Sequence, residues 1–454
     1  MDLLSEFKIV LSAATEWGIK NVLIHRKNFE APFNNLKHSK KFISACHRGY
    51  EKAQSRIINI ISAIKNDQAL SESEKIYWEL CFRRIIDSIA YAMIGTQTHV
   101  ARRLVLHYCP PPIDLNVINA NKKVADILNA ESRLTFALLA DLSTFIHVCD
   151  ILRVDFRQDI PKLLLIEVKS GRVNEILLEK LASYEPKQES LDLLEKDQAI
   201  EKRYKSQAKR ILRQKIRIQQ IMEILKTDKG IDIQTGKLLK LLGPSIQTSD
   251  YDSFLNQLCN IARNESIASG TVQFCIHIGV AYAQDVEEAI NNSMKAALFG
   301  YYESLKKMTN ELSEVRAELS CYLDQKEFIK GWDPFIWNLY SMSDNPFPLW
   351  KIDRKNIFSL VESKMKIFTI FDLPAFIYLS RKLGLNIRLS SRKKTGEIIK
   401  QLGRRHIPTW GGRVLVVDTP KGELTIGGGI IHRFIVDLKT PSQFIYKLAH
   451  GDSS

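Results

Sequence analysis

Apolar residues recur every three to four positions along much of the first 125 residues of this 454-residue chain. The clearest example contains Ile76, Leu80 and Ile89, a spacing that places apolar side chains on one face of a helix. The prolines at 110–112 end this pattern, because proline removes a backbone donor and breaks a helix. We therefore expect a mostly helical region over residues 1–125.

The pattern changes to a continuous apolar run at Leu163–Ile166, which predicts a short buried strand. Glu167, Val168 and Lys169 follow, and Ser170–Gly171 then breaks the strand. Alternate residues of a strand share a face, so Glu167 and Lys169 point the same way and Val168 points to the other side. Charged groups at the end of a buried strand need partners or a function, because an unpaired buried charge is costly.

A second acid interrupts the preceding apolar segment, where Asp150 stands within residues 148–152. Residues 157–161 have the composition of a turn. Antiparallel pairing across this turn would bring Asp150 towards the strand end that carries Glu167 and Lys169. We therefore expect two carboxylates and one ammonium at the ends of two neighbouring strands.

This combination of groups suits phosphodiester hydrolysis. Carboxylate oxygens bind Mg²⁺ or Mn²⁺, and Mg²⁺ typically keeps several waters and binds substrate phosphate. The cation neutralises the phosphate and lowers the pKa of a bound water, and Lys169 would orient that water or stabilise the transition state. The alternative is a solvated ion pair of Glu167 and Lys169, worth ~0–1 kcal/mol, which leaves Asp150 unexplained.

Asp150 and Glu167-Val168-Lys169 together resemble the active-site signature of the PD-(D/E)XK, or restriction-endonuclease-like, nuclease superfamily. Cys149 precedes Asp150 where Gly or Pro is common in that family, which is a departure from the pattern. The resemblance covers about residues 131–220. It implies an α/β fold with a restriction-endonuclease-like mixed-sheet core. It also implies that Asp150, Glu167 and the carbonyl of Val168 bind Mg²⁺ or Mn²⁺.

The resemblance further implies two supporting residues. The family often adds an acid on a helix before the first strand, where Glu131 fits and Asp141 is a rival. It often adds a polar residue on the helix after the second strand, where Gln214 is one match and Gln219 and Gln220 are rivals. The plain alternatives are a surface acid for Glu131 and a solvated helix face for Gln214.

Positive charge is concentrated downstream of the proposed strands. The chain has a formal net charge of +14, which attracts nucleic-acid phosphate irrespective of base sequence. Residues 201–217 contain eight Lys or Arg and one Glu, and at helical spacing a row of three lysines and one arginine lines one side, Lys202, Lys205, Lys209 and Arg213. An ordinary solvated helix face is the alternative. The residues predicted to contact the nucleic-acid backbone are Lys202, Lys205, Lys209, Arg210, Arg213 and Arg217.

Two other segments resemble functional motifs without matching them. Asp418 and Asp437–Lys439 again combine an acid with an acid–apolar–base strand end, but a Gly-rich segment between them breaks the two-strand pattern. Polar ends of hairpin strands are the favoured interpretation there. Residues 230–238 resemble a phosphate-binding loop, but they have one residue too many between the glycines, and Leu238 replaces the Ser or Thr that would hold Mg²⁺.

The length of the chain suggests two to four domains. We divide it into a helical domain over 1–125, a nuclease-like domain over 126–310 and a C-terminal α+β domain over 311–454. An apolar strand over 271–280 is a candidate to complete the catalytic sheet. Within the C-terminal domain, helices are expected over about 356–366 and 373–383.

The seven cysteines are scattered and include no CxxC pair, a pattern typical of reduced cytoplasmic thiols. No secretory signal and no run of ~18–20 apolar residues is present, so we expect a cytoplasmic protein without a membrane partner. The prediction is a metal-dependent DNA endonuclease, similar in its large flanks to bacterial anti-phage defence effectors. Cutting both strands at once would need a homo-oligomer or a partner protein. The rivals are an inactive nuclease-fold binding or scaffold protein and an RNase.

Overall fold

The computed structural model describes residues 1–16, 36–95, 98–105, 112–158, 161–169, 171–187, 189–197, 200–227, 229–231, 238–240, 250–307, 309–320, 335–340, 351–402, 412–419, 422–426, 434 and 438–450. Contacts divide the chain into two compact units, Met1–Pro244 and Ser245–Ser454. This division differs from the boundaries expected after residues 125 and 310. The fold is mixed α/β, and each unit combines helices with strands. The strand pairs of the described residues are all antiparallel, so the parallel pairing that the expected mixed sheet requires does not occur among them.

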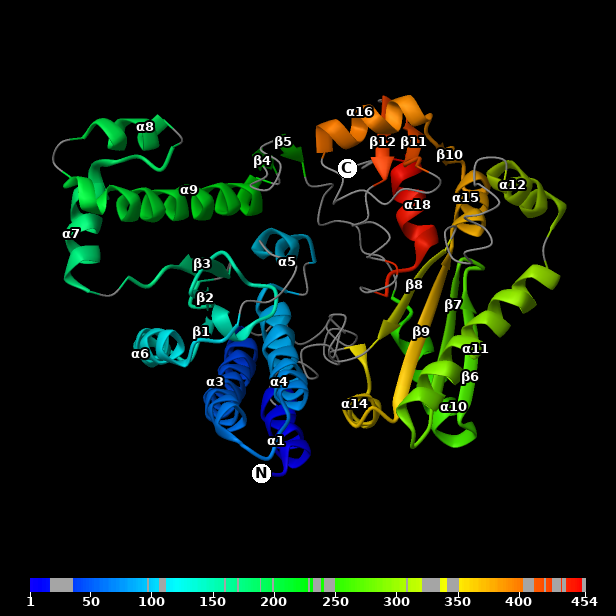
Figure 1. The fold of residues 1–454 in the computed structure, drawn as a ribbon, viewed down its shortest axis with the longest axis horizontal. Helices are drawn as coiled ribbons and strands as arrows, with labels where there is room; N and C mark the ends of the chain where they lie inside the picture. The colour runs from blue at the N-terminus through cyan, green and yellow to red at the C-terminus, as the bar shows by residue number, and fades with distance from the viewer. Residues whose placement is uncertain are drawn as a thin grey trace. The chain divides into compact units, whose positions relative to one another are not determined.

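The first unit begins with helices, as the periodicity predicts. The helix α4 starts with a capping box, in which Ser71 Oγ accepts from the Glu74 N–H and Glu74 accepts from the Ser71 N–H. The helices α1, α3 and α4 pack together, with the rings of Phe7 and Phe82 5.8 Å apart (Figure 1). The helices in this part of the chain are α1 (Leu3–Glu16), α3 (Leu36–Asn66), α4 (Glu72–Met93), α5 (Thr98–Leu104) and α6 (Leu115–Glu131).

A three-stranded antiparallel sheet follows, built from β1 (Thr135–Leu139), β2 (Ile151–Asp155) and β3 (Lys162–Ile166) in that order. The outer edge of β1 is covered by side chains from two helices. Gln54 of α3 donates to the Ala137 carbonyl and accepts from the Leu139 N–H, and Asn129 of α6 accepts from the Ala137 N–H. The backbone groups of this edge are thereby satisfied inside the protein.

The strand β3 is less buried than its apolar sequence predicts. Leu165 is buried, but Leu163, Leu164 and Ile166 are only half-buried and Lys162 is exposed. The reason is its position in the sheet: among the described residues, β3 pairs with β2 alone, so it forms an edge.

Three helices extend the unit beyond β3. Gly171 precedes the first of them with φ of 92°, a left-handed conformation that costs glycine little. The helices are α7 (Arg172–Lys180), α8 (Glu189–Lys196) and α9 (Lys205–Thr227), and they share a small apolar core that includes Leu177, Leu194 and Leu212. The short strands β4 (Lys229–Ile231) and β5 (Leu238–Lys240) then pair with each other.

The second unit contains its own antiparallel sheet, in the order β6-β7-β9-β8. The helix α11 packs against β7 and β9 (Figure 1). Gly279 allows this close approach, because a Cβ there would meet the Ser293 carbonyl oxygen at 2.0 Å. The elements of this sheet and its helices are α10 (Asp252–Glu265), β6 (Ile267–Val272), β7 (Ile276–Tyr282), α11 (Val286–Lys306), α12 (Asn310–Ser320), β8 (Phe335–Tyr340), α14 (Arg354–Val361), β9 (Met365–Asp372) and α15 (Leu373–Lys382).

One strand prediction was wrong in its placement. The strand expected over 271–280 forms as β7, but it pairs with β6 and β9 and does not join the β1-β2-β3 sheet. The remaining elements of the second unit are β10 (Ile387–Leu389), α16 (Arg392–Leu402), β11 (Leu415–Thr419), β12 (Gly422–Ile426) and α18 (Pro441–His450), and β10, β11 and β12 form a small sheet. None of the helices in the described ranges is long and apolar enough to cross a membrane.

A buried histidine makes the stability of the first unit dependent on pH. His47 is packed beside Tyr50, Phe136 and Phe156, and its Nδ1 lies 3.0 Å from the Arg133 carbonyl oxygen. Burial lowers the pKa of His47 from 6.5 to about 4, against the smaller opposing effect of its backbone hydrogen bonds.

Because the unfolded chain binds this proton more readily, the His47 contribution is intact above pH 6.5 and is lost as the pH falls towards 4. We expect the free energy of unfolding to fall by up to about 3 kcal/mol from this group across that window. Denaturant unfolding at pH 7, 5.5 and 4 checks this result. His47→Phe should show a shallower fall, and equal slopes for the two proteins would contradict the assignment.

Candidate active site

The backbone pairing of β2 and β3 continues beyond the strand ends and places Asp150 opposite Glu167. Ile151 pairs with Ile166, and the Asp150 N–H donates to the Ile166 carbonyl at 3.0 Å. One carboxylate oxygen of Asp150, Oδ2, accepts from the Val168 N–H at 2.6 Å. The antiparallel pairing expected from the sequence therefore brings the two acids together.

Lys169 contacts Glu167 directly. Its Nζ lies 2.6 Å from Glu167 Oε2, and the two side chains are only 10% and 16% exposed. Burial raises the pKa of Glu167; the hydrogen bond from Lys169 opposes that rise, and the negative charge of Asp150 adds to it. Together with Asp150, Glu167 and Lys169 form a partly desolvated cluster of two carboxylates and one ammonium, and the description as a solvated surface ion pair does not fit it.

A third acid, Asp141, lies close to Asp150 and Glu167. Asp141 belongs to a short 3-10 helix, Ala140–Leu142, directly after β1, and its Oδ2 accepts from Asn121 Nδ2 at 3.1 Å. Burial raises the pKa of Asp141, and the charge of Asp150 raises it further. The buried Cys149 thiol also has a raised pKa, caused first by burial and then by the charges of Glu167, Asp150 and Asp141. The Ala140 N–H also donates to the Asp150 carbonyl at 2.9 Å, so the segment that carries Asp141 lies directly beside Asp150.

Glu131 lies elsewhere. It is the last residue of α6, and its Oε2 lies 2.5 Å from the Arg153 guanidinium and 3.7 Å from that of Arg157. Arg153 is a buried residue of β2, so it needs an anionic partner, and Glu131 provides it. Between the two acids that the sequence offered as supporting residues, the structure brings Asp141, and not Glu131, next to Asp150.

Gln214 is half-buried on α9, and its Oε1 accepts no hydrogen bond from the described residues. No interaction in the described part of the chain connects it with Asp150 or Glu167. Its rival Gln219 is exposed and Gln220 is half-buried. A different glutamine of α9 reaches the helix that follows β3: Gln207 Nε2 donates to Asn174 Oδ1 of α7 at 2.5 Å.

The basic residues predicted to contact nucleic acid differ in their surroundings. Lys202 lies in the 3-10 helix Lys202–Tyr204 before α9 and is exposed. Lys205 donates to the Glu195 carbonyl, and Lys209 forms an ion pair with the Glu195 carboxylate, so both hold α8 against α9. The expected single row of lysines is therefore interrupted by these structural contacts. On α9 itself, the basic residues that share a face at helical spacing are Arg210, Arg213 and Arg217, of which the first two are exposed and the third half-buried.

The competing acid near the C-terminus is part of a surface ion-pair group. Asp418 is exposed on β11 and accepts from Asn386 Nδ2 at 2.8 Å and from Arg388. The hydrogen bond from Arg388 lowers the pKa of Asp418. Asp437 lies outside the described residues. This environment agrees with a polar strand end.

The donor set around Asp150 fits a hard divalent cation. It consists of oxygen atoms only, the ligand type that Mg²⁺ and Mn²⁺ prefer. Within the described residues, no three His, Cys, Asp or Glu side chains converge closely enough to enclose a metal ion by themselves. Mg²⁺ commonly takes one or two carboxylates and completes its shell with water and phosphate oxygens, so the pair Asp150 and Glu167 meets its minimum requirement.

The comparisons with known proteins add no relatives: no protein-family description, no curated protein and no solved structure matches this chain. The function is therefore inferred from the geometry of the site. Asp141 had one signal in the sequence, since it follows an apolar run at 136–140, most of which lies in β1. Asn121, which donates to it, had none.

Proposed function

We propose that this protein is a metal-dependent nuclease that hydrolyses phosphodiester bonds of DNA, with a restriction-endonuclease-like core in its first unit. The observation that carries the proposal is the cluster at the ends of β2 and β3, where Asp150 faces Glu167 and Lys169 contacts Glu167 at 2.6 Å. Apolar side chains would cost less free energy than charged ones at these partly buried positions, because each charge there needs a compensating partner.

In this proposal Asp150 and Glu167 hold one Mg²⁺ or Mn²⁺, with the Val168 carbonyl as a further ligand. When bound, the cation supplies charge neutralisation at the phosphate and a bound water of lowered pKa. Lys169 holds the attacking water by a hydrogen bond or donates to the phosphate oxygen where negative charge develops. The Val168 N–H fixes Asp150 through the 2.6 Å hydrogen bond, which keeps its other oxygen, Oδ1, for the cation.

A nuclease assay on the purified chain tests the proposal and separates it from its rivals. Supercoiled plasmid, linear DNA and RNA are incubated with the protein in Mg²⁺, Mn²⁺ or EDTA. We expect metal-dependent loss of supercoiled plasmid. Cleavage confined to RNA would make the protein an RNase. Binding of nucleic acid without cleavage in either metal would make it an inactive nuclease-fold protein.

The exposed arginines of α9 provide the proposed contact with the DNA backbone. Arg210→Glu with Arg213→Glu should weaken DNA binding and reduce the slope of log affinity against log salt by about 2 or more, because phosphate contacts release counterions. Fluorescence anisotropy from 50 to 300 mM salt measures the slope.

The matched control for this pair is Lys205→Ala with Lys209→Ala. These lysines contact Glu195 of α8, so their loss should lower thermal stability. The salt slope of DNA binding should stay near that of wild type. An unchanged salt slope in the arginine double variant would assign this face of α9 to solvent or to a protein partner.

A defence role is a separate part of the proposal. It is tested by expressing the chain in bacteria and counting phage plaques, with the Lys169→Ala variant as the control. Equal plaque counts for the two proteins would remove this role and leave the nuclease proposal unchanged.

A further inference from the structure

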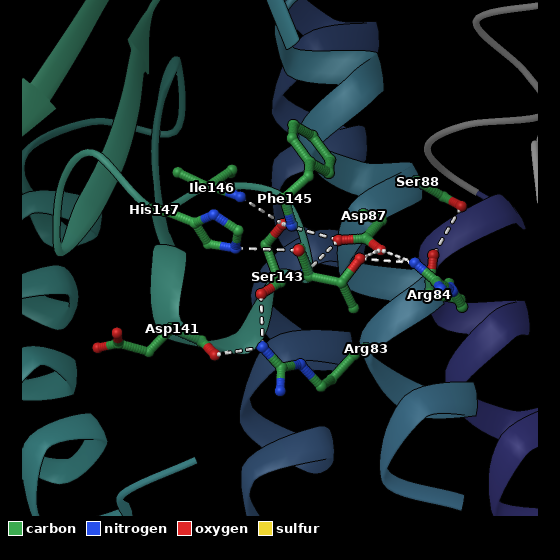
Figure 2. Close-up of polar contacts among 10 residues, drawn as sticks. Arg83, Arg84, Asp87, Ser88, Asp141, Ser143, Phe145, Ile146 and His147 are labelled. Carbon is green, nitrogen blue, oxygen red and sulfur yellow. Dashed lines mark hydrogen bonds and ion pairs between the residues drawn. The ribbon is translucent and has the colours of Figure 1, made fainter. Parts of the chain in front are cut away.

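The loop between β1 and β2 carries one acid of the cluster at each end, Asp141 at its beginning and Asp150 at its close. Its middle is held by charged side chains of α4 that lie inside the protein (Figure 2). Arg83 is 1% exposed, Asp87 5% and Arg84 6%. Buried charges of this kind persist only where their hydrogen bonds are satisfied, so their partners indicate what they do.

The partners of Arg83 include backbone carbonyls of the loop. One guanidinium nitrogen, Nη2, donates to the Ser143 carbonyl at 2.7 Å and lies 3.4 Å from the Asp141 carbonyl. The other, Nη1, lies 3.3 Å from Glu79 Oε1 on the same helix. Figure 2 shows the Asp141 carbonyl facing Arg83 while its carboxylate points the other way. Arg83 thereby fixes the backbone from which the Asp141 carboxylate extends.

Asp87 holds Ser143 and Thr144 of the loop. Its Oδ1 accepts from Ser143 Oγ and from the Thr144 N–H, both at 2.7 Å, and its Oδ2 accepts from Thr144 Oγ1 at 2.5 Å. Arg84 donates to the same Asp87 oxygen and to Thr144 Oγ1. Further along, the His147 N–H donates to the Leu104 carbonyl at 2.8 Å, which ties the loop to α5 as well.

We infer that Arg83 and Asp87 are positioning residues for the candidate site, which set the placement of Asp141 and Asp150 by holding the loop between them. This assigns a role to the N-terminal helices beyond forming a core. The effect on metal binding rests on the proposed function, but the effect on the loop does not. Apolar side chains would fill the same interior, yet they cannot hold carbonyls and amide groups in one arrangement.

Hydrogen exchange of the full chain in EDTA tests the effect on the loop without any metal or substrate. In Arg83→Met, the amides of residues 141–150 should exchange at least about 10-fold faster, while those of α3 change little. Glu79→Gln is the matched control, because it removes the negative charge of an Arg83 partner that lies outside the loop. Equal acceleration across the first unit, or no acceleration in the loop, would overturn the inference.

Titration with Mn²⁺ alone then tests the effect on the site. We expect Arg83→Met to bind Mn²⁺ about 10- to 100-fold more weakly than wild type, the usual cost of losing an outer-shell contact, and Glu79→Gln to bind like wild type. If Arg83→Met does not fold, Ser143→Ala removes one loop contact to Asp87 and should show the same effects on a smaller scale.

The outcomes of these two experiments separate the inference from the proposed function. Wild type without Mn²⁺ affinity would defeat the metal site, and hydrogen exchange would still decide whether α4 holds the loop. A loosened loop with unchanged Mn²⁺ affinity would overturn the positioning role.

Discussion

Asp150→Asn should lower Mg²⁺-dependent DNA cleavage by more than about 100-fold, because even loss of an outer-shell partner of a metal site costs 10- to 100-fold. The substitution removes the charge that the cation needs. The side chain that replaces the acid can still accept from the Val168 N–H, which Asp150 does at 2.6 Å, so the fold should be retained. Cleavage rates at saturating Mg²⁺, together with Mn²⁺ affinity from calorimetry, measure the effect.

Asp155→Asn is the matched control for this change. Asp155 lies at the other end of β2 and pairs with Arg157, away from the cluster. We expect cleavage within about 3-fold of wild type, because Asp155 bonds to Arg157 and lies outside the site. If both variants cut DNA at the wild-type rate, Asp150 does not bind the metal. If both are equally impaired, the effect comes from the strand and not from the site.

The second large effect distinguishes the two candidate supporting acids. Asp141→Asn should lower cleavage by about 10- to 100-fold, because Asp141 directly follows Ala140, whose N–H donates to the Asp150 carbonyl at 2.9 Å, and so lies beside the site. Glu131→Gln should leave the cleavage rate nearly unchanged. Its cost should be thermodynamic, because the buried Arg153 loses its anionic partner, and we expect lower stability by about 1–3 kcal/mol.

Cleavage kinetics and denaturant unfolding of these two variants measure both quantities. The expected pattern is a crossed one, with Asp141→Asn impaired in rate and Glu131→Gln impaired in stability. The reverse pattern would return Glu131 to the site and would contradict the assignment of Asp141.

The central part of the site was accessible from local sequence because it depends on two neighbouring strands. Once Leu163–Ile166 and the segment after Asp150 are recognised as strands joined by a short connection, antiparallel pairing places Asp150 opposite Glu167. Lys169 stands two residues after Glu167, just beyond the end of β3 at Ile166, and contacts it there. No distant part of the chain is needed for this step.

The supporting residues depend on distant parts of the chain, and the sequence could not rank them. Glu131 forms an ion pair with Arg153, a buried residue of β2. The apolar residues around Arg153 in the sequence give no sign of this pairing. The expected lysine row fails for a similar reason, since Lys205 and Lys209 contact Glu195 of α8. Helical periodicity alone does not show which charges of a helix meet another helix.

Two larger features also required tertiary information. The strand Ile276–Tyr282 has the apolar sequence of a core strand, but nothing in that sequence shows which sheet it joins. The buried charges of α4, Arg83 and Asp87, interrupt an apolar helix, and their role becomes visible only when the loop at 141–144 lies against them (Figure 2).

The most direct test of the nuclease proposal compares wild type with Lys169→Ala in one experiment, in which Mn²⁺ affinity and single-turnover cleavage of DNA are measured on the same preparations. Lys169 contacts Glu167 but is not a proposed metal ligand. We expect wild type to cut DNA with Mg²⁺ and not in EDTA. We expect Lys169→Ala still to bind Mn²⁺ and to lose at least about 100-fold in cleavage rate. Identical behaviour of the two proteins, whether both cut or neither does, would contradict the nuclease proposal.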